Sequence, residues 1–172
     1  MRHLTVAALL FAMPVIAVAQ DAAPSYTADG KLNFPAGYRE WIWLSTDFDL
    51  SYGDSVQPGS HTFGNVFVDR AAYAAFRKTK VWPDKTMMVL ELRGAGGDNP
   101  LNKRGQYQSG APMGLELHVK DSAKGGWGFY GFNAATRAPA ALLPKTASCY
   151  ACHEKNGASD TTFTQFYPSL AE

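Results

Sequence analysis

Both cysteines of this chain of 172 residues lie in one pentapeptide, which reads Cys149-Tyr150-Ala151-Cys152-His153. Two thiols at this spacing, on a turn or on the first turn of a helix, can each add to one vinyl group of a haem, and the adjacent histidine then meets the iron. The second ring nitrogen of that histidine would donate to a carbonyl or a water, which fixes the tautomer. The motif therefore predicts one covalently attached haem c, held by Cys149 and Cys152, with His153 as the proximal iron ligand.

Other uses of the two cysteines fit the sequence less well. A redox-active dithiol begins a helix that follows a strand in a βαβ unit, and no such unit is visible around this segment. Structural zinc needs four ligands, and His61 and His118, the other histidines beyond the first few residues, stand alone in the sequence. A disulfide across two intervening residues would be strained and would close a trivial loop. Haem attachment is the preferred interpretation.

The function of the haem depends on what occupies the second axial position of its iron. Methionine sulfur is a usual partner for a histidine-ligated electron-transfer haem. The sequence offers Met87, Met88 and Met113 as sulfur ligands and His61 as a nitrogen alternative. An apolar face without such a ligand would instead bind small neutral gases such as NO or CO, with Phe63 among the candidate wall residues. Electron transfer and gas binding both remain open at this point.

Catalysis is a third use of a haem, and it would need an acid, a base or a cation beside the iron. Glu91, Glu116 and Arg104 are charged candidates in or near the predicted strands. Charged residues of strands and loops are usually solvated, so these three are candidates only. Catalysis is therefore a third possible function, in addition to electron transfer and gas binding.

The first nineteen residues have the pattern of a signal peptide. Arg2 and His3 give a positive start, residues 4–18 are an apolar run interrupted by Pro14, and residues 17–19 fit the small-residue cleavage rule. The run is shorter than the roughly twenty residues that a membrane-spanning helix needs, although an uncleaved anchor is the alternative. The sequence predicts a signal peptide over 1–19 and a single haem domain over 20–172, exported to the periplasm and without a membrane span.

Composition is typical of one folded domain without a nucleic-acid partner. The chain has 46% hydrophobic and 18% charged residues, which argues against disorder. Its formal net charge is +1, and no block of lysine or arginine stands out, so nothing indicates a surface for nucleic acid or anionic lipid. The content of Trp, Tyr and Phe favours a β-rich interior or the walls of a large flat ligand.

The pattern of apolar residues predicts an α+β fold, mainly an antiparallel β-sheet with a few helices. Alternation and β-formers predict strands at 62–68, 86–92, 113–120 and 127–132. Asp69 can cap a helix over 70–79. Residues 38–44 could begin as a helical turn or as a strand. Residues 93–112, rich in glycine, are predicted to be the longest loop. Strands joined by turns, with few helices between them, favour antiparallel pairing.

Beyond the cysteine motif, the chain resembles the cytochrome P-460 family and its relatives the cytochromes c′-beta. The resemblance covers most of the sequence after the signal peptide and is most specific in the C-terminal block around the motif. Its other segments are residues 38–41, 66–69, 73–79, 86–92, 114–122 and 127–132. It implies a mainly antiparallel β fold with helices, one c-type haem and a homodimer.

The resemblance also implies where this chain departs from the enzymes of the family. The enzymatic members oxidise hydroxylamine and carry a lysine cross-linked to the haem edge, at the position of Leu90 in this sequence. They share a distal arginine, which falls at Gly64. Neither Leu90 nor Gly64 can replace these groups. The resemblance therefore favours the c′-beta members, which lack the cross-link and bind NO and CO, and places Leu90 near the haem.

Strand geometry adds a ranking of the methionine candidates. Side chains at positions i and i+2 of a strand share a face, so Met88 points the same way as Leu90. Met113 opens the next strand after the long loop and is the second candidate. The sequence thus predicts a mono-haem cytochrome whose partner is a small gaseous or nitrogen-oxide ligand or a redox protein, with His/Met coordination by Met88 or Met113 as an option. A hydroxylamine-oxidising or peroxidase-like enzyme is the alternative.

Overall fold

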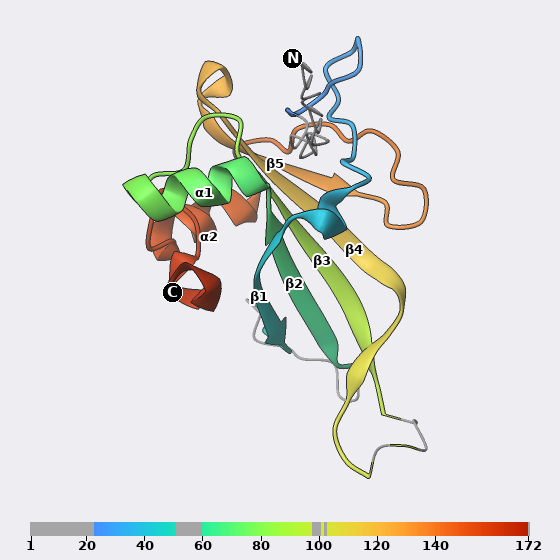
Figure 1. The fold of residues 1–172 in the computed structure, drawn as a ribbon. Helices are drawn as coiled ribbons and strands as arrows, with labels where there is room; N and C mark the ends of the chain where they lie inside the picture. Colours follow the sequence, from blue (N-terminus) through green and yellow to red (C-terminus); the bar gives the residue numbers. More distant parts are fainter. Residues whose placement is uncertain (1–22, 51–59, 98–100, 102, 172) are drawn as a thin grey trace, which may run out of the picture.

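A computed structural model describes residues 23–50, 60–97, 101 and 103–171 of the chain (Figure 1). The predicted signal peptide therefore lies outside the described residues. No helix in the described part of the chain is long and apolar enough to cross a membrane.

The fold is a five-stranded antiparallel sheet whose strands follow one another in chain order, with two short α-helices. This confirms the predicted α+β class. The strands are β1 (Ile42–Phe48), β2 (Thr62–Val68), β3 (Met87–Gly96), β4 (Tyr107–Asp121) and β5 (Gly126–Phe132). The helices are α1 (Arg70–Thr79) and α2 (Ser148–Asn156), with 3-10 turns η1 (Tyr38–Glu40), η2 (Ser122–Lys124), η3 (Thr164–Phe166) and η4 (Pro168–Leu170).

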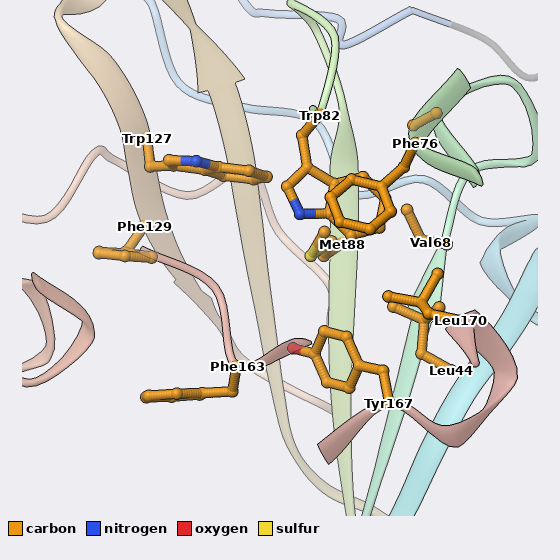
Figure 2. Close-up of a cluster of buried hydrophobic side chains, with 11 residues drawn as sticks. Leu44, Val68, Phe76, Trp82, Met88, Trp127, Phe129, Phe163, Tyr167 and Leu170 are labelled. Atoms are coloured by element: carbon orange, nitrogen blue, oxygen red, sulfur yellow. The ribbon is translucent and has the colours of Figure 1, made fainter. Parts of the chain in front are cut away.

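Each face of the sheet has its own hydrophobic cluster, because alternate residues of a strand point to opposite faces. On one face, Met88 joins residues of α1 and of the C-terminal segment, and α2 packs against them through its cysteines. Figure 2 shows this cluster, with Met88 among large aromatic rings. On the other face, Met87 and Val89 join the cluster of Tyr38 and the N-terminal segment. Both helices therefore cover the same face of the sheet (Figure 1).

The α1 helix begins as the sequence predicts. Asp69 is its N-cap, and Oδ1 of Asp69 accepts a hydrogen bond of 2.8 Å from the backbone N–H of Ala72. The other carboxylate oxygen accepts from the backbone N–H of Met87 at 2.9 Å, which ties the helix to the start of β3. One short side chain thus accepts hydrogen bonds from backbone N–H groups of both the first turn of α1 and the start of β3. A cap of this kind fixes where the helix starts.

The prediction of a loop over residues 93–112 is wrong for much of this segment, because both of its ends belong to strands. Strand β3 continues to Gly96, β4 already begins at Tyr107, and the two pair through Gly94–Ser109 and Gly96–Tyr107. Glycines indicate loops in a sequence, but here they belong to a long hairpin with an irregularity between Leu92 and Gly94. At residues 38–44 both open alternatives occur, a helical turn followed by a strand.

Glu91 is a buried charge on the face of β3 that packs against the N-terminal segment. Its side chain is 4% exposed and accepts hydrogen bonds from Tyr38, Arg39 and Arg93. Burial alone would raise the pKa of Glu91, but these donors outweigh it and the pKa is lowered from 4.5. Glu91 therefore stabilises the fold as an anion.

We predict that Glu91→Gln lowers the free energy of unfolding by about 2–4 kcal/mol, since it leaves two arginines facing a neutral amide. The contribution of Glu91 is complete above its unfolded-state pKa of 4.5 and is lost as pH falls through the lower folded-state value. Urea unfolding at pH 7 and pH 3 measures both effects. Asp29→Asn, in an exposed pair with Lys31, is the control and should change nothing measurable. Equal stability of Glu91→Gln and the parent at pH 7 would contradict this account.

Candidate haem site

The cysteine motif opens onto a cavity of about 780 Å³ between α2, the C-terminal segment and the face of the sheet. This volume is typical of sites for cofactors and other sizeable ligands. Cys149, Cys152 and His153 all line the cavity. The other lining residues are Ser45, Thr46, Asp47, Leu50, Val66, Met88, Val89, Leu90, Leu92, Glu116, His118, Ser148, Phe163, Phe166 and Tyr167.

Helix α2 presents the two thiols. Cys149 lies in its first turn and Cys152 in the next, and both thiols are free and partly exposed. Tyr150 fastens the helix to the sheet, because its hydroxyl accepts from the backbone N–H of Phe129 at 3.3 Å and donates to the carbonyl of Leu143 at 3.2 Å. The thiols therefore face the cavity from a helix that is fixed to β5.

The His153 ring is held so that one nitrogen remains available. Its Nδ1 lies 2.8 Å from the carbonyl oxygen of Thr161, which can only accept, so Nδ1 carries the proton and Nε2 is the unprotonated atom. Burial, and then the nearby His118, lower the pKa of His153 to about 4. The ring also contacts Phe163, with centroids 4.3 Å apart, and Phe129, at 4.8 Å. A neutral imidazole with a fixed tautomer is the form that binds a metal.

Two of the predicted site residues on the sheet line the cavity, and two do not. Met88 and Leu90 both lie in its β3 wall, and Met88 is only 3% exposed. Met113 is 59% exposed on β4 and lies outside the cavity lining. Phe63 lines a separate hollow with Phe48 and His61. The structure thus joins Met88 and Leu90 to the cysteine motif and keeps Met113 and Phe63 apart from it.

Sequence reasoning missed Asp47, which lines the cavity from β1. Asp47 pairs with Gly64 across the β1–β2 ladder, and a Cβ built on Gly64 would lie 2.5 Å from Oδ2 of Asp47. Burial raises the pKa of the Asp47 carboxyl. The carboxylate therefore sits over the glycine at which the resemblance places the distal arginine of the enzymes. Only the strand pairing, which the sequence does not give, reveals this neighbour.

Of the three charged residues considered for catalysis, only Glu116 lies at the cavity. Glu116 lines the cavity, 3.9 Å from Nε2 of His118, which lowers the pKa of the Glu116 carboxyl. Glu91 is buried on the opposite face of the sheet, and Arg104 is exposed outside the cavity lining. His118, treated as isolated in the sequence, packs its ring against His153, with centroids 4.9 Å apart.

The donor set of the cavity fits a haem. Two thiols, a histidine with a free Nε2 and an apolar wall share one hollow, which is the chemistry that covalent attachment and iron ligation require. When bound, a haem would supply an iron centre for ligand binding or one-electron transfer. Cys149 and Cys152 would hold the macrocycle, and His153 would hold the iron.

Comparison with known proteins agrees with this chemistry. The family model described as Cytochrome P-460 matches residues 35–164, which include all five strands, both helices and the cysteine motif. No curated protein matches the sequence. The matched region is most of the chain and contains all the residues that line the cavity except Phe166 and Tyr167. The chain therefore belongs to the cytochrome P-460 family and is a haem-binding cytochrome.

Proposed function

We propose that this protein is an exported mono-haem c-type cytochrome that binds NO or another small uncharged ligand at its iron. Cys149 and Cys152 form the two thioether bonds, and His153 is the proximal ligand. The observation that carries the proposal is the shared cavity, in which the motif meets a wall containing Leu90. The alkyl side chain of Leu90 leaves room for a small ligand and has no amine that could form a cross-link to the haem.

The charges of the cavity support an uncharged ligand. Two carboxylates, Asp47 and Glu116, line it, and its described lining contains no lysine or arginine. A carboxylate in a partly buried site repels an anion more strongly than it would in water. Nitrogen oxides and carbon monoxide carry no charge, so this repulsion does not act on them.

Leu90 offers a direct test of ligand access. We predict that Leu90→Trp slows CO binding to the reduced protein by about tenfold, since ~1.4 kcal/mol of added barrier corresponds to that factor. Stopped-flow absorption measures the rate. Met113→Leu, which changes a side chain of similar size outside the cavity, is the matched control and should bind CO at the parent rate. An unchanged rate in Leu90→Trp would contradict the placement of the ligand path along this wall.

Electron transfer through a His153/Met88 haem is the second candidate function. It is favoured by the burial of Met88 in the cavity wall, because a sulfur ligand must be close to the iron and shielded from water. If Met88 is the ligand, a sulfur-to-iron charge-transfer band will be present and will vanish in Met88→Ala while remaining in Met113→Ala. If neither variant changes the spectrum, this candidate is rejected.

An enzymatic role finds less support in the cavity. Glu116 supplies an acid or base there. The family resemblance, however, puts the cross-linking lysine of the enzymatic members at Leu90, which has no amine. The purified haem-loaded protein is therefore expected to turn over hydroxylamine and peroxide no faster than free haem. Faster turnover would replace the ligand-binding proposal.

The proposed setting is the periplasm, after cleavage of residues 1–19, with a homodimer as the oligomeric state and a redox protein as the partner in the second candidate function. The signal-peptide pattern and the family resemblance support these proposals. The intact mass of the exported protein, together with its mass in solution by light scattering, tests cleavage and dimerisation.

A further inference from the structure

We infer that Lys120 and Asp160 are positioning residues that press the Thr161 carbonyl against His153 and thereby lower the reduction potential of the haem. The inference rests on the proposed function, since it concerns the electron donation of the proximal ligand. It assigns a role to side chains that lie outside the cavity lining and outside the cysteine motif.

The backbone that carries the Thr161 carbonyl has an unfavourable conformation. Asp160 and Thr161 have φ angles of 48° and 58°, so two consecutive residues other than glycine are left-handed. For the β-branched Thr161 this region is especially unfavourable. Such a conformation persists only where surrounding contacts enforce it, and it is frequent at sites where geometry matters for function.

The contacts that enforce this conformation come from the sheet. Nζ of Lys120, on β4, lies 2.7 Å from Oδ2 of Asp160 and also donates to the carbonyl of Trp82 at 2.7 Å. The indole of Trp82, which is fully buried, donates to Oγ1 of Thr162 at 3.0 Å. Thr162 also bridges back to Ser159 through the backbone. The two left-handed residues are therefore fixed on both sides, by an ion pair before the Thr161 carbonyl and by a buried hydrogen bond after it.

Gly157 allows the turn to approach the end of α2. A Cβ at position 157 would lie 2.5 Å from the carbonyl carbon of Thr161 and 2.7 Å from the carbonyl oxygen of His153. Both atoms belong to backbone and cannot move aside cheaply. Since φ of Gly157 is −69°, an alanine there would strain no dihedral angle, and its Cβ would force the turn at Thr161 and the end of α2 at His153 apart.

The consequence is chemical as well as structural. A histidine that donates a strong hydrogen bond from Nδ1 is a more basic ligand through Nε2. A more basic ligand stabilises the oxidised iron relative to the reduced iron and so lowers the potential, because second-shell hydrogen bonds tune haem centres. Loosening the turn should weaken the bond between His153 and Thr161 and raise the potential.

The test is the reduction potential of the haem-loaded protein, measured by spectroelectrochemistry, in Asp160→Asn and Gly157→Ala. Asparagine keeps the tolerance of left-handed backbone but removes the ion pair. We expect both variants to shift the oxidised-to-reduced ratio about tenfold toward the reduced form, which is ~59 mV for one electron. The iron–histidine stretching frequency of the reduced protein should fall in both. Asp29→Asn, in the exposed pair with Lys31, is the matched control and should leave both readouts unchanged.

The outcomes separate this inference from the proposed function. Haem-loaded variants with the parent potential and the parent stretching frequency would overturn the positioning role while leaving haem attachment intact. A parent protein without haem would overturn the proposed function, and this inference with it. If Asp160→Asn does not fold, the result for Gly157→Ala decides, because this variant keeps the side chains of the ion pair and separates the turn from the end of α2.

Discussion

Replacing Cys149 and Cys152 together by alanine will abolish covalent haem attachment. The two thiols are free, they face one cavity from the first turns of α2, and these are the only cysteines of the sequence. The intact mass of the exported parent should exceed that of its polypeptide by one haem, and the double variant should lack this addition. Ser148→Ala, a neighbouring change in the same cavity lining, is the control and should keep the full addition.

A parent mass equal to that of the bare polypeptide, in cells that mature other c-type cytochromes, would contradict the thioether assignment. Retention of the added mass in the double variant would contradict it as well. In either case the cavity could still take a haem, but the cysteines would not be the residues that hold it.

Replacing His153 by glycine will remove the proximal ligand while leaving the haem attached. Nε2 is the ring atom available to the iron, because Nδ1 is bonded to the Thr161 carbonyl. Glycine removes the whole ring and leaves a space that an imidazole molecule from solution can fill. The absorption spectrum should change completely, and imidazole added to the solution should restore the parent spectrum. Retention of the parent spectrum without imidazole would show that another residue holds the iron.

His118→Gln is the matched control for this variant. His118 lines the same cavity and packs against His153, yet it is paired with Glu116 and is assigned no bond to iron. Histidine ligation should persist in His118→Gln. If this variant instead loses the parent spectrum and His153→Gly keeps it, the two roles must be exchanged.

Local signals in the sequence were sufficient for the elements and residues that depend on near neighbours. Helix α1 has the bounds that the sequence predicts, beginning after its cap Asp69, and β2 has its predicted bounds. The face shared by Met88 and Leu90 follows from strand alternation, and the cavity lining includes both. These features are set by spacing along the chain, which a single sequence contains.

What could not be predicted depends on pairing between distant segments. The glycines of residues 93–112 indicate a loop, but Gly94 and Gly96 are held in a ladder by partners on β4. Asp47 faces the cavity only because β1 pairs with β2, which brings it over Gly64. Met113 is exposed for a related reason, since it lies beside the irregular part of the β3–β4 pairing rather than in the cavity wall.

The measurement that tests the central claim most directly is the absorption spectrum of the oxidised and reduced protein, before and after addition of NO or CO. The account predicts a haem spectrum of high-spin type that shifts promptly when either gas is added, because the iron would have His153 on one side and an open position on the other. A low-spin spectrum with a sulfur-to-iron band that CO leaves unchanged would contradict gas binding and establish an electron carrier. A protein without haem absorption would contradict the account as a whole.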